Sequence, residues 1–258
     1  MSEAYQAELA HFQELTREFG GVDSYTTEQA VQIIDQIFQM VREQGLDPEN
    51  RAEFFEGICR IFHIQFVNHE DYARYAQGRY VFAPNHISEF DGLIFGTIIP
   101  NIMVVAKSDW ISNPTLNGFI EKLFTIVAVV RHDSKSGMKV LRDCIEHLKE
   151  SENGAVTVFV QQTIADLDIT TPEDVATGAY HIAQKGGAQV IPVYCEQAST
   201  EHPTRIVFGS PIVCEDKNEF GALWLESERA LRDAIKDPSA RKPVLCEKHQ
   251  KPISQRGF

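Results

Sequence analysis

Apolar positions recur at helical intervals in the first part of the chain. From Ala30 to Val41 they return every three or four residues, and Thr26 and Gln29 before them have capping-box spacing. The run from Arg51 to Phe66 is crowded with apolar residues in a similar pattern. We therefore predict a helical pair in residues 1–75 that packs on the main domain. An apolar platform for lipid or acyl chains is the alternative interpretation of the same pattern.

From residue 80 onward the pattern changes to short β-rich runs that alternate with helical ones. The predicted strands are Tyr80–Ala83, Ile102–Ala106, Ile126–Val130, Ala155–Val160, Gln189–Tyr194 and Arg205–Phe208. The predicted helices are Glu89–Ile98, Thr115–Leu123, Lys135–Lys149, Pro172–Lys185 and Phe220–Ile235. Strands separated by helical lengths need crossover connections, so we predict an α/β domain with a largely parallel or mixed central sheet flanked by helices. We place this domain at residues 76–215, after a helical appendage (1–75) and before a C-terminal helix and tail (216–258).

Composition and charge narrow the class of protein. Lys and Arg number 24 against 37 Asp and Glu, so the net charge is −13, which argues against nucleic acid as a partner. Neither a secretory signal nor an apolar run of the roughly 18 residues that a membrane span needs is visible. We therefore expect a cytoplasmic protein. Any contact with the inner face of the membrane is expected to be peripheral, through the N-terminal helices.

The cysteines and histidines show no pattern typical of a metal site or a disulfide framework. The five cysteines are scattered along the chain, which favours reduced thiols, and we predict no metal. Cys144 and His147 lie three residues apart on a predicted helix. A buried cysteine beside a surface histidine explains this pair better than a nucleophile and its base.

The segment from Pro84 to Gly92 carries the strongest chemical signal. It directly follows a predicted strand, where an α/β sheet places its ligand crevice. His86 and Asp91 have four residues between them, so the carboxylate can accept a hydrogen bond from one imidazole nitrogen and leave the other free as a base. A structural histidine beside a capping aspartate is the competing interpretation, and Ser88 fits a helix cap as well as it fits chemistry.

Further segments accompany this pair in a fixed order. Lys107 to Gly118 leads to a run that ends at Arg131, Thr177-Gly178-Ala179 follows later, and Val190 to Val193 is a strand with a central proline. Together with Asn85-His86-Ile87-Ser88-Glu89-Phe90-Asp91, an Asn-His-x4-Asp block, these segments resemble the PlsC-like glycerolipid acyltransferases, the lysophosphatidate acyltransferase group. The resemblance covers roughly Val81 to Val213. It is far more specific than the first block alone.

The third block of that family departs from the usual pattern in this chain. Phe159-Val160-Gln161-Gln162-Thr163-Ile164 stands where the family usually has Phe-Pro-Glu-Gly-Thr-Arg. The amide of Gln161 thus replaces a carboxylate, and Ile164 replaces a cation. Because a phosphate site needs N–H groups, Arg or Lys, two interpretations stay open: an unchanged acceptor with a local substitution, or an acceptor without a phosphate.

The resemblance implies an acyltransferase that moves a fatty acyl group from acyl-CoA or acyl carrier protein to a hydroxyl of a lysophospholipid-like acceptor. These donors are co-substrates, and no bound cofactor is expected. The alternatives are a specialised acyltransferase for a non-phosphorylated hydroxyl or amine, and a non-catalytic lipid-binding relative. The expected site residues are His86 as general base, Asp91 as its partner, Asn85 and Ser88 as oxyanion or positioning groups, Arg131, Gln161, Gln162 and Thr163 for the acceptor, and Lys107 and Lys135 for the donor.

Overall fold

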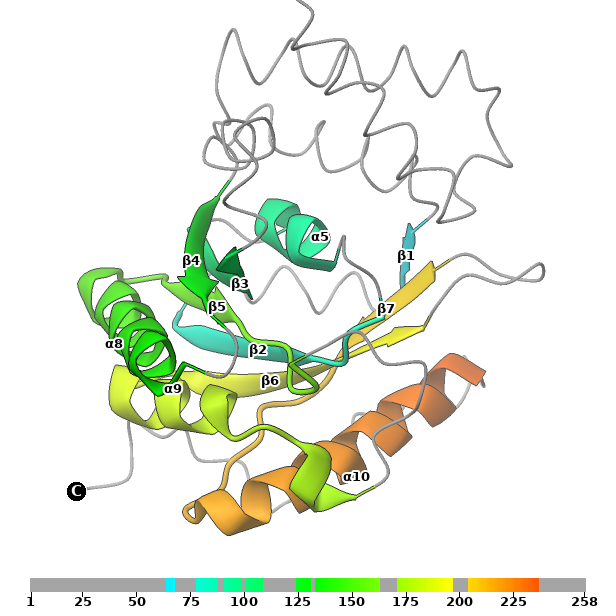
Figure 1. Cartoon of the computed structure of the whole chain (residues 1–258). Helices are drawn as coiled ribbons and strands as arrows, with labels where there is room; N and C mark the ends of the chain where they lie inside the picture. The colour runs from blue at the N-terminus through cyan, green and yellow to red at the C-terminus, as the bar shows by residue number, and fades with distance from the viewer. Residues whose placement is uncertain are drawn as a thin grey trace, which may run out of the picture.

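A seven-stranded sheet forms the centre of the protein. A computed structural model of the chain describes residues 64–67, 78–87, 91–98, 101–108, 124–130, 133–162, 171–196 and 204–236. Within these residues the strand order is β1-β7-β6-β2-β5-β3-β4 (Figure 1). The strands are β1 (Ile64–Phe66), β2 (Tyr80–Pro84), β3 (Ile102–Lys107), β4 (Thr125–Val129), β5 (Ala155–Thr157), β6 (Gln189–Glu196) and β7 (Thr204–Phe208). All neighbours pair in parallel except β6 and β7, so the predicted mixed α/β sheet is confirmed.

The helices are divided between the two faces of the sheet. They are α5 (Asp91–Ile98), α8 (Ser134–Glu150), α9 (Gly178–Gly186) and α10 (Lys217–Lys236), with the short 3-10 helix η2 at Pro172–Asp174. The chain travels from β2 to β3 through α5, and it returns along the sheet through α8 to β5 and through α9 to β6. A right-handed crossover must change face when its direction reverses. In agreement, α5 lies on one face, and α8, α9 and α10 lie on the other (Figure 1).

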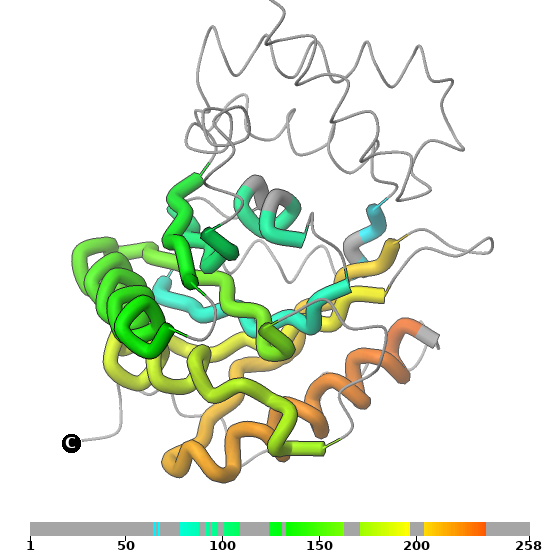
Figure 2. The backbone as a smooth tube through the Cα atoms, viewed as in Figure 1, coloured from blue at the N-terminus to red at the C-terminus, as the bar shows by residue number. Residues whose placement is uncertain are grey.

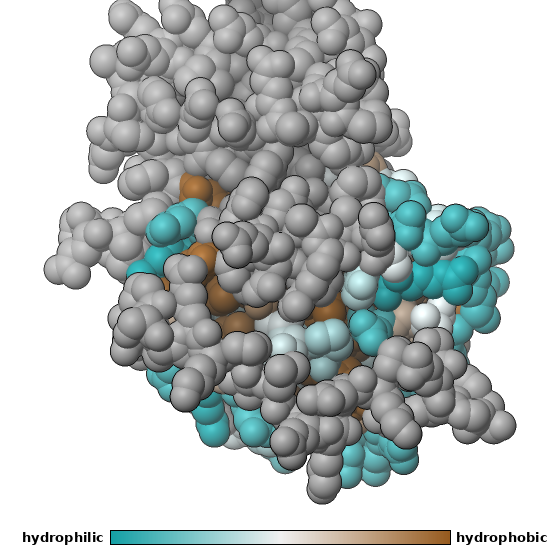
Figure 3. All heavy atoms as spheres, turned by 180° about the vertical axis from the view of Figure 1, so that it is seen from behind, coloured by the Kyte–Doolittle hydropathy of each residue, from teal (hydrophilic) through white to brown (hydrophobic). Residues whose placement is uncertain are grey.

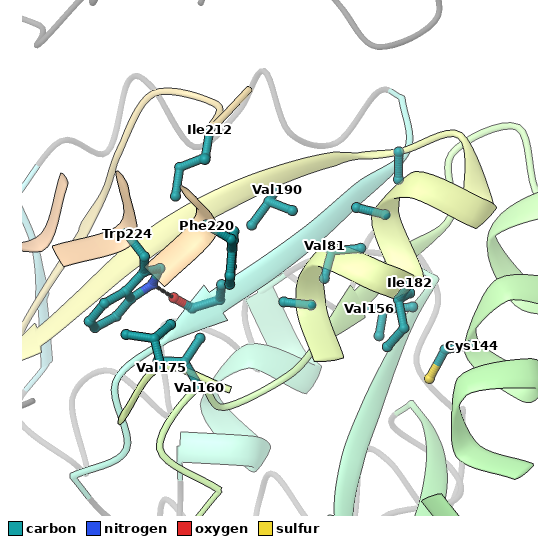
Figure 4. Packing of buried hydrophobic residues seen from close by; sticks show 14 of the residues in the cluster. Val81, Cys144, Val156, Val160, Val175, Ile182, Val190, Ile212, Phe220 and Trp224 are labelled. Atoms are coloured by element: carbon teal, nitrogen blue, oxygen red, sulfur yellow. Dashed lines mark hydrogen bonds between the residues drawn. The ribbon is translucent and has the colours of Figure 1, made fainter. Parts of the chain in front are cut away.

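Strand alternation separates the apolar core into two parts. Val81 and Ala83 of β2 point into a cluster shared with α8, α9 and α10, whereas Phe82 between them belongs to an aromatic group near α5. Figure 4 shows the first cluster, with Trp224 of α10 at one end and Cys144 of α8 at the other. The indole N–H of Trp224 donates to the carbonyl oxygen of Ala83 at 2.8 Å, which fixes α10 beneath the end of β2.

The second part of the core is built largely from aromatic rings. Phe95 of α5 meets Phe159 and Phe208 edge to face, with ring centroids 6.1 and 6.5 Å apart, and Phe82 contacts Phe208 in the same way at 5.8 Å. The smooth trace of Figure 2 shows how β2, β5 and β6, which are distant in sequence, lie side by side. Where described side chains are visible from behind, apolar ones lie toward the middle and hydrophilic ones toward the border (Figure 3).

Pro192 lies inside β6, where the sheet accommodates it with a bulge. Val193 pairs with Phe208, but Val190 bridges to Ile212, so one extra residue stands on the β7 side between these pairs. Gly209 donates its N–H to the carbonyl oxygen of Pro192 at 2.8 Å. A proline therefore stands in this strand because its missing N–H falls where regular pairing is interrupted.

Three predicted elements differ from the structure. Ile64–Phe66 is a strand paired with β7, so the predicted helix from Arg51 to Phe66 is wrong at its end, and the sheet includes a segment that precedes residue 76. Pro172–Lys185 is not one helix, because the N–H of Ala176 donates to the carbonyl oxygen of Val160 and breaks the helical path between η2 and α9. The strand β5 ends at Thr157 rather than Val160.

The shorter β5 still follows β2 beyond its formal end. The N–H groups of Val158 and Val160 donate to the carbonyl oxygens of Phe82 and Pro84 at 3.0 and 3.2 Å. Helices predicted at Thr115–Leu123 and in the first 63 residues lie outside the described residues. None of the helices within the described part of the chain combines the length and the apolar character needed to cross a membrane.

Candidate active site

Most of the predicted site residues in the described part of the chain lie at the carboxyl ends of parallel strands. Because β2, β5, β3 and β4 run parallel, their carboxyl ends share one edge of the sheet. His86 follows β2, Gln161 and Gln162 follow β5, and Lys107 is the last residue of β3. Ser88, Arg131 and Thr163 lie outside the described residues.

His86 and Asp91 form the pair that their spacing predicted. The imidazole Nδ1 lies 2.9 Å from Oδ2 of Asp91, the first residue of α5. The same oxygen accepts the N–H of Ile87 at 2.8 Å. A neutral imidazole that donates its Nδ1–H to this carboxylate has its lone pair on Nε2.

The environment of the pair buries the carboxylate and holds the ring in place. Asp91 is only 2% exposed, and its position at the start of α5 lets the helix dipole stabilise its negative charge. The ring of His86 stacks on Phe159, with centroids 4.1 Å apart and an interplanar angle of 22°. The imidazole side chain keeps 17% of its surface exposed, so it is held in place without being sealed off.

Asn85 connects the loop that carries His86 to β6. Its Oδ1 accepts the N–H of Cys195 at 2.7 Å, and its Nδ2 donates to the carbonyl oxygen of Cys195 at 2.8 Å. Backbone pairing between the two strands ends one step earlier, at Pro84 and Val193. The side chain of Asn85 thus makes the bonds that a further strand residue would make, while its own backbone turns away from the sheet. This contact is a positioning role.

Gln161 holds the same loop from the opposite side. Its Oε1 accepts the backbone N–H of His86 at 2.5 Å. The next residue, Gln162, has a φ of +58°, in the left-handed region that favours glycine, and its N–H donates to the carbonyl oxygen of Phe159 at 3.1 Å. Gln162 stands where the family pattern has its glycine, the residue that adopts this φ at no steric cost.

The two lysines expected to bind the donor lie farther along the edge. Lys107 is half-buried at the end of β3, which is separated from β2 by β5, so the two strand axes lie about 10 Å apart. Lys135 is exposed in the first turn of α8, and its backbone N–H donates to Oδ1 of the capping residue Asp133 at 2.9 Å. Both positions border the edge where His86 lies.

The described cysteines near these elements are poor nucleophiles. Complete burial raises the pKa of the Cys195 thiol well above its usual value, and the negative charge of Asp91 raises it further. Burial, together with Asp143, raises the pKa of Cys144 to about 12, and the ring of His147 contacts the carbonyl oxygen of Asn101 instead. Both thiols therefore stay protonated at neutral pH.

The contacts of Asp91 and Phe159 fix the orientation of the His86 ring. Among the described residues, no three His, Cys, Asp or Glu side chains are grouped so that they could hold a metal ion. Two features of the site escaped the sequence pattern: the stacking of Phe159 on His86 and the bond from His86 to Gln161. Their only signal was membership in the third block, since both contacts join segments about 75 residues apart.

Comparison with known proteins agrees with this geometry. The model of the family described as "Acyltransferase" matches residues 63–196, just over half of the chain, and this match includes β1. The crystal structure of the 1-acyl-sn-glycerophosphate (LPA) acyltransferase PlsC from Thermotoga maritima superposes with a TM-score of 0.54 at 17% identity. The match covers 90% of this chain and 98% of that one, which shows that the two share a fold. The chain belongs to the acyltransferase family.

Proposed function

We propose that this acyltransferase moves a fatty acyl group from a thioester to a hydroxyl, with His86 as general base. The observation that carries the proposal is the 2.9 Å contact between Nδ1 of His86 and the buried carboxylate of Asp91. It leaves Nε2 as the proton acceptor on a ring that is already oriented.

The reaction needs one base that returns its proton. As the hydroxyl oxygen attacks the thioester carbonyl, Nε2 of His86 takes its proton, and the C–O bond forms. The tetrahedral intermediate then collapses, the C–S bond breaks, and the leaving thiolate takes the proton back from the imidazolium. A thiol has a pKa of about 8.5, so the thiolate leaves without a strong dedicated acid.

Asp91 supports both halves of this cycle. Its carboxylate keeps the proton on Nδ1 before the attack, and its charge stabilises the imidazolium that forms during the attack. The N–H of Ile87 and the start of α5 both interact favourably with a negative charge on Asp91.

For the acceptor, we propose a lysophospholipid of the 1-acylglycerol-3-phosphate type. The Thermotoga protein, which shares the fold, is a 1-acyl-sn-glycerophosphate acyltransferase, and this chain has Arg131 at the end of the second block. Arg131 and Thr163 are the proposed phosphate ligands, and Lys107 and Lys135 are the proposed contacts of acyl-CoA or acyl carrier protein. The neutral Ile164, where the family has arginine, favours a non-phosphorylated acceptor as the second candidate. A lysolipid is presented at a membrane surface, so we place the enzyme in the cytoplasm with peripheral contact to the inner face.

Thiol release from acyl-CoA and from acyl carrier protein, measured with a panel of acceptors, tests the proposal. The wild-type enzyme is expected to prefer phosphate-bearing lysolipids. His86→Ala should lower kcat by roughly 10²- to 10⁴-fold, the usual contribution of a general base. His147→Gln is the matched control, since His147 lies on α8 and contacts Asn101, and it should keep full activity.

Two results would change the proposal. Undiminished turnover by His86→Ala would remove the base and, with it, the mechanism. A preference for neutral alcohols or amines would keep the mechanism but select the second candidate for the acceptor.

A further inference from the structure

We propose that Gln161 is a positioning residue, which sets the place of His86 and does not bind the acyl acceptor. This inference rests on the proposed function, in which His86 is the base. The contact that motivates it is the 2.5 Å bond from the backbone N–H of His86 to Oε1 of Gln161. Sequence alone had assigned Gln161 to the acceptor.

The segment after β5 places Gln161 against the loop of His86. It keeps following β2, because the N–H of Val160 donates to the carbonyl oxygen of Pro84 at 3.2 Å. Val160 turns its side chain into the core shared with α8, α9 and α10, and Phe159 before it points to the opposite face, where its ring stacks on His86. The bond from the N–H of Gln162 to the carbonyl oxygen of Phe159 then closes a turn, and the side chain of Gln161 within this turn contacts the same loop. The segment after β5 therefore contacts His86 at two points: Phe159 stacks on the imidazole ring, and Gln161 accepts the backbone N–H.

The chemistry of this contact requires an acceptor of a given length but not a charge. A backbone N–H can only donate, so its partner must present an oxygen. The glutamine amide does so, and the glutamate of the family pattern has the same reach. The side-chain oxygen of Gln161 thus already accepts a hydrogen bond from the backbone of His86, and we infer that it does not bind the acyl acceptor.

The neutral amide also limits the negative charge around the imidazole. Of the described titratable groups near the pair, α5 contributes the carboxylate of Asp91, and β6 contributes the thiol of Cys195. Phe159 and Gln161, which contact His86 from the segment after β5, carry no charge. A carboxylate at residue 161 would place a second negative charge beside the loop of His86.

Three variants separate positioning from acceptor binding. Gln161→Met keeps the length of the side chain but removes the oxygen, and it should lower kcat about tenfold or more while the acceptor KM stays within about twofold, because a displaced base slows chemistry without weakening ground-state binding. Gln161→Glu restores the oxygen, so kcat should return to within about threefold of wild type. Gln184→Met is the matched control, since Gln184 lies on α9 and donates to the carbonyl oxygen of Cys214, and it should leave both constants unchanged.

Other outcomes would overturn the inference. A rise in the acceptor KM at constant kcat in Gln161→Met would make Gln161 an acceptor ligand, and failure of Gln161→Glu to recover kcat would exclude the hydrogen bond as the cause. If thermal unfolding shows that Gln161→Met is misfolded, Gln161→Asn replaces it, because its shorter amide cannot reach His86 and should also lose kcat. An inactive His86→Ala enzyme beside a fully active Gln161→Met enzyme would refute this inference alone. An active His86→Ala enzyme would refute the proposed function.

Discussion

Thr157 carries a buried hydroxyl for which the structure shows no hydrogen-bond partner. The residue lies in β5 between β2 and β3 and has no exposed surface. An unsatisfied buried polar group costs about 1–3 kcal/mol. Thr157→Val has nearly the same shape and removes this cost, so we expect the free energy of unfolding to rise by about 1 kcal/mol, measured by urea denaturation.

The same substitution at a satisfied hydroxyl provides the control. Thr171 caps η2, and its hydroxyl donates to Oδ2 of Asp174 at 2.8 Å, so Thr171→Val should leave stability unchanged or lower it. A Thr157→Val protein less stable than wild type would mean that the Thr157 hydroxyl has a partner in solution.

At the scale of single residues, sequence predicts contacts within a segment and misses those between segments. His86 and Asp91 are five positions apart, so their spacing already brings the two side chains together. Asn85 meets Cys195 across 110 residues and Gln161 meets His86 across 75, and only the order of strands in the sheet decides these contacts. The positive φ of Gln162 was also hidden, since glutamine gives no signal for it.

At the scale of elements, Gly221 controls how closely α10 packs against η2. A Cβ on Gly221 would lie 2.2 Å from the carbonyl oxygen of Pro172, which is backbone and cannot rotate away. We expect Gly221→Ala to lower the free energy of unfolding by about 1–3 kcal/mol, as overpacking usually does. Because Trp224 follows on the same helix and binds the end of β2, kcat should fall as well.

The matched variant is Gly137→Ala on α8. Apart from its chain neighbours and the nearby backbone of α8 itself, nothing lies within 4 Å of a Cβ built on Gly137. The better helix propensity of alanine should therefore raise stability by up to about 1 kcal/mol. Chemical denaturation of both variants separates the effect of helix propensity from that of the close contact with Pro172. A stabilised Gly221→Ala protein would show that α10 can move away from η2 without a loss of stability.

The elements that sequence misjudged share a physical cause. Three residues of β1 are too few for alternation to stand out from the helical pattern before them, and their partner β7 lies about 140 positions later, as the pair Ile64 and Thr204 shows. The break between η2 and α9 depends on a bond from Ala176 to Val160. The longer elements, such as α8 and β6, were predicted because burial leaves a clear pattern in their sequences. In α8 one face is buried and apolar residues recur with the helical period, and in β6 both faces are buried and the apolar run is continuous.

At the scale of the whole molecule, His181 should make stability depend on pH. Burial lowers the pKa of this α9 side chain, and the charges of Lys185 and Lys217 lower it further. The pKa of a histidine in the unfolded chain is about 6.5. As the pH falls below this value, His181 is protonated in the unfolded chain but remains neutral in the folded protein. The folded state is therefore destabilised toward acid.

Replacing this histidine should reduce that loss. Between pH 7.5 and 5.5, the urea midpoint of His181→Gln should fall less than that of the wild-type protein, because glutamine does not titrate. Equal falls in the two proteins would assign the acid sensitivity to other groups, and a steeper fall in the variant would reverse the sign of the argument.

The overall architecture was the most predictable level. Alternating strands and helices predicted a largely parallel or mixed sheet, and the handedness of crossovers accounts for the helices on each face. The strand order itself is not written in any local pattern, since β5 inserts between β2 and β3, which precede it in the chain.

The loop of His86 is held by contacts from α5, from the segment after β5 and from β6. Lys107, the last residue of β3, lies outside these contacts, because β5 separates its strand from β2. We therefore expect substitutions at the carboxyl end of β3 to change how the substrates bind, while the contacts that hold His86 stay in place.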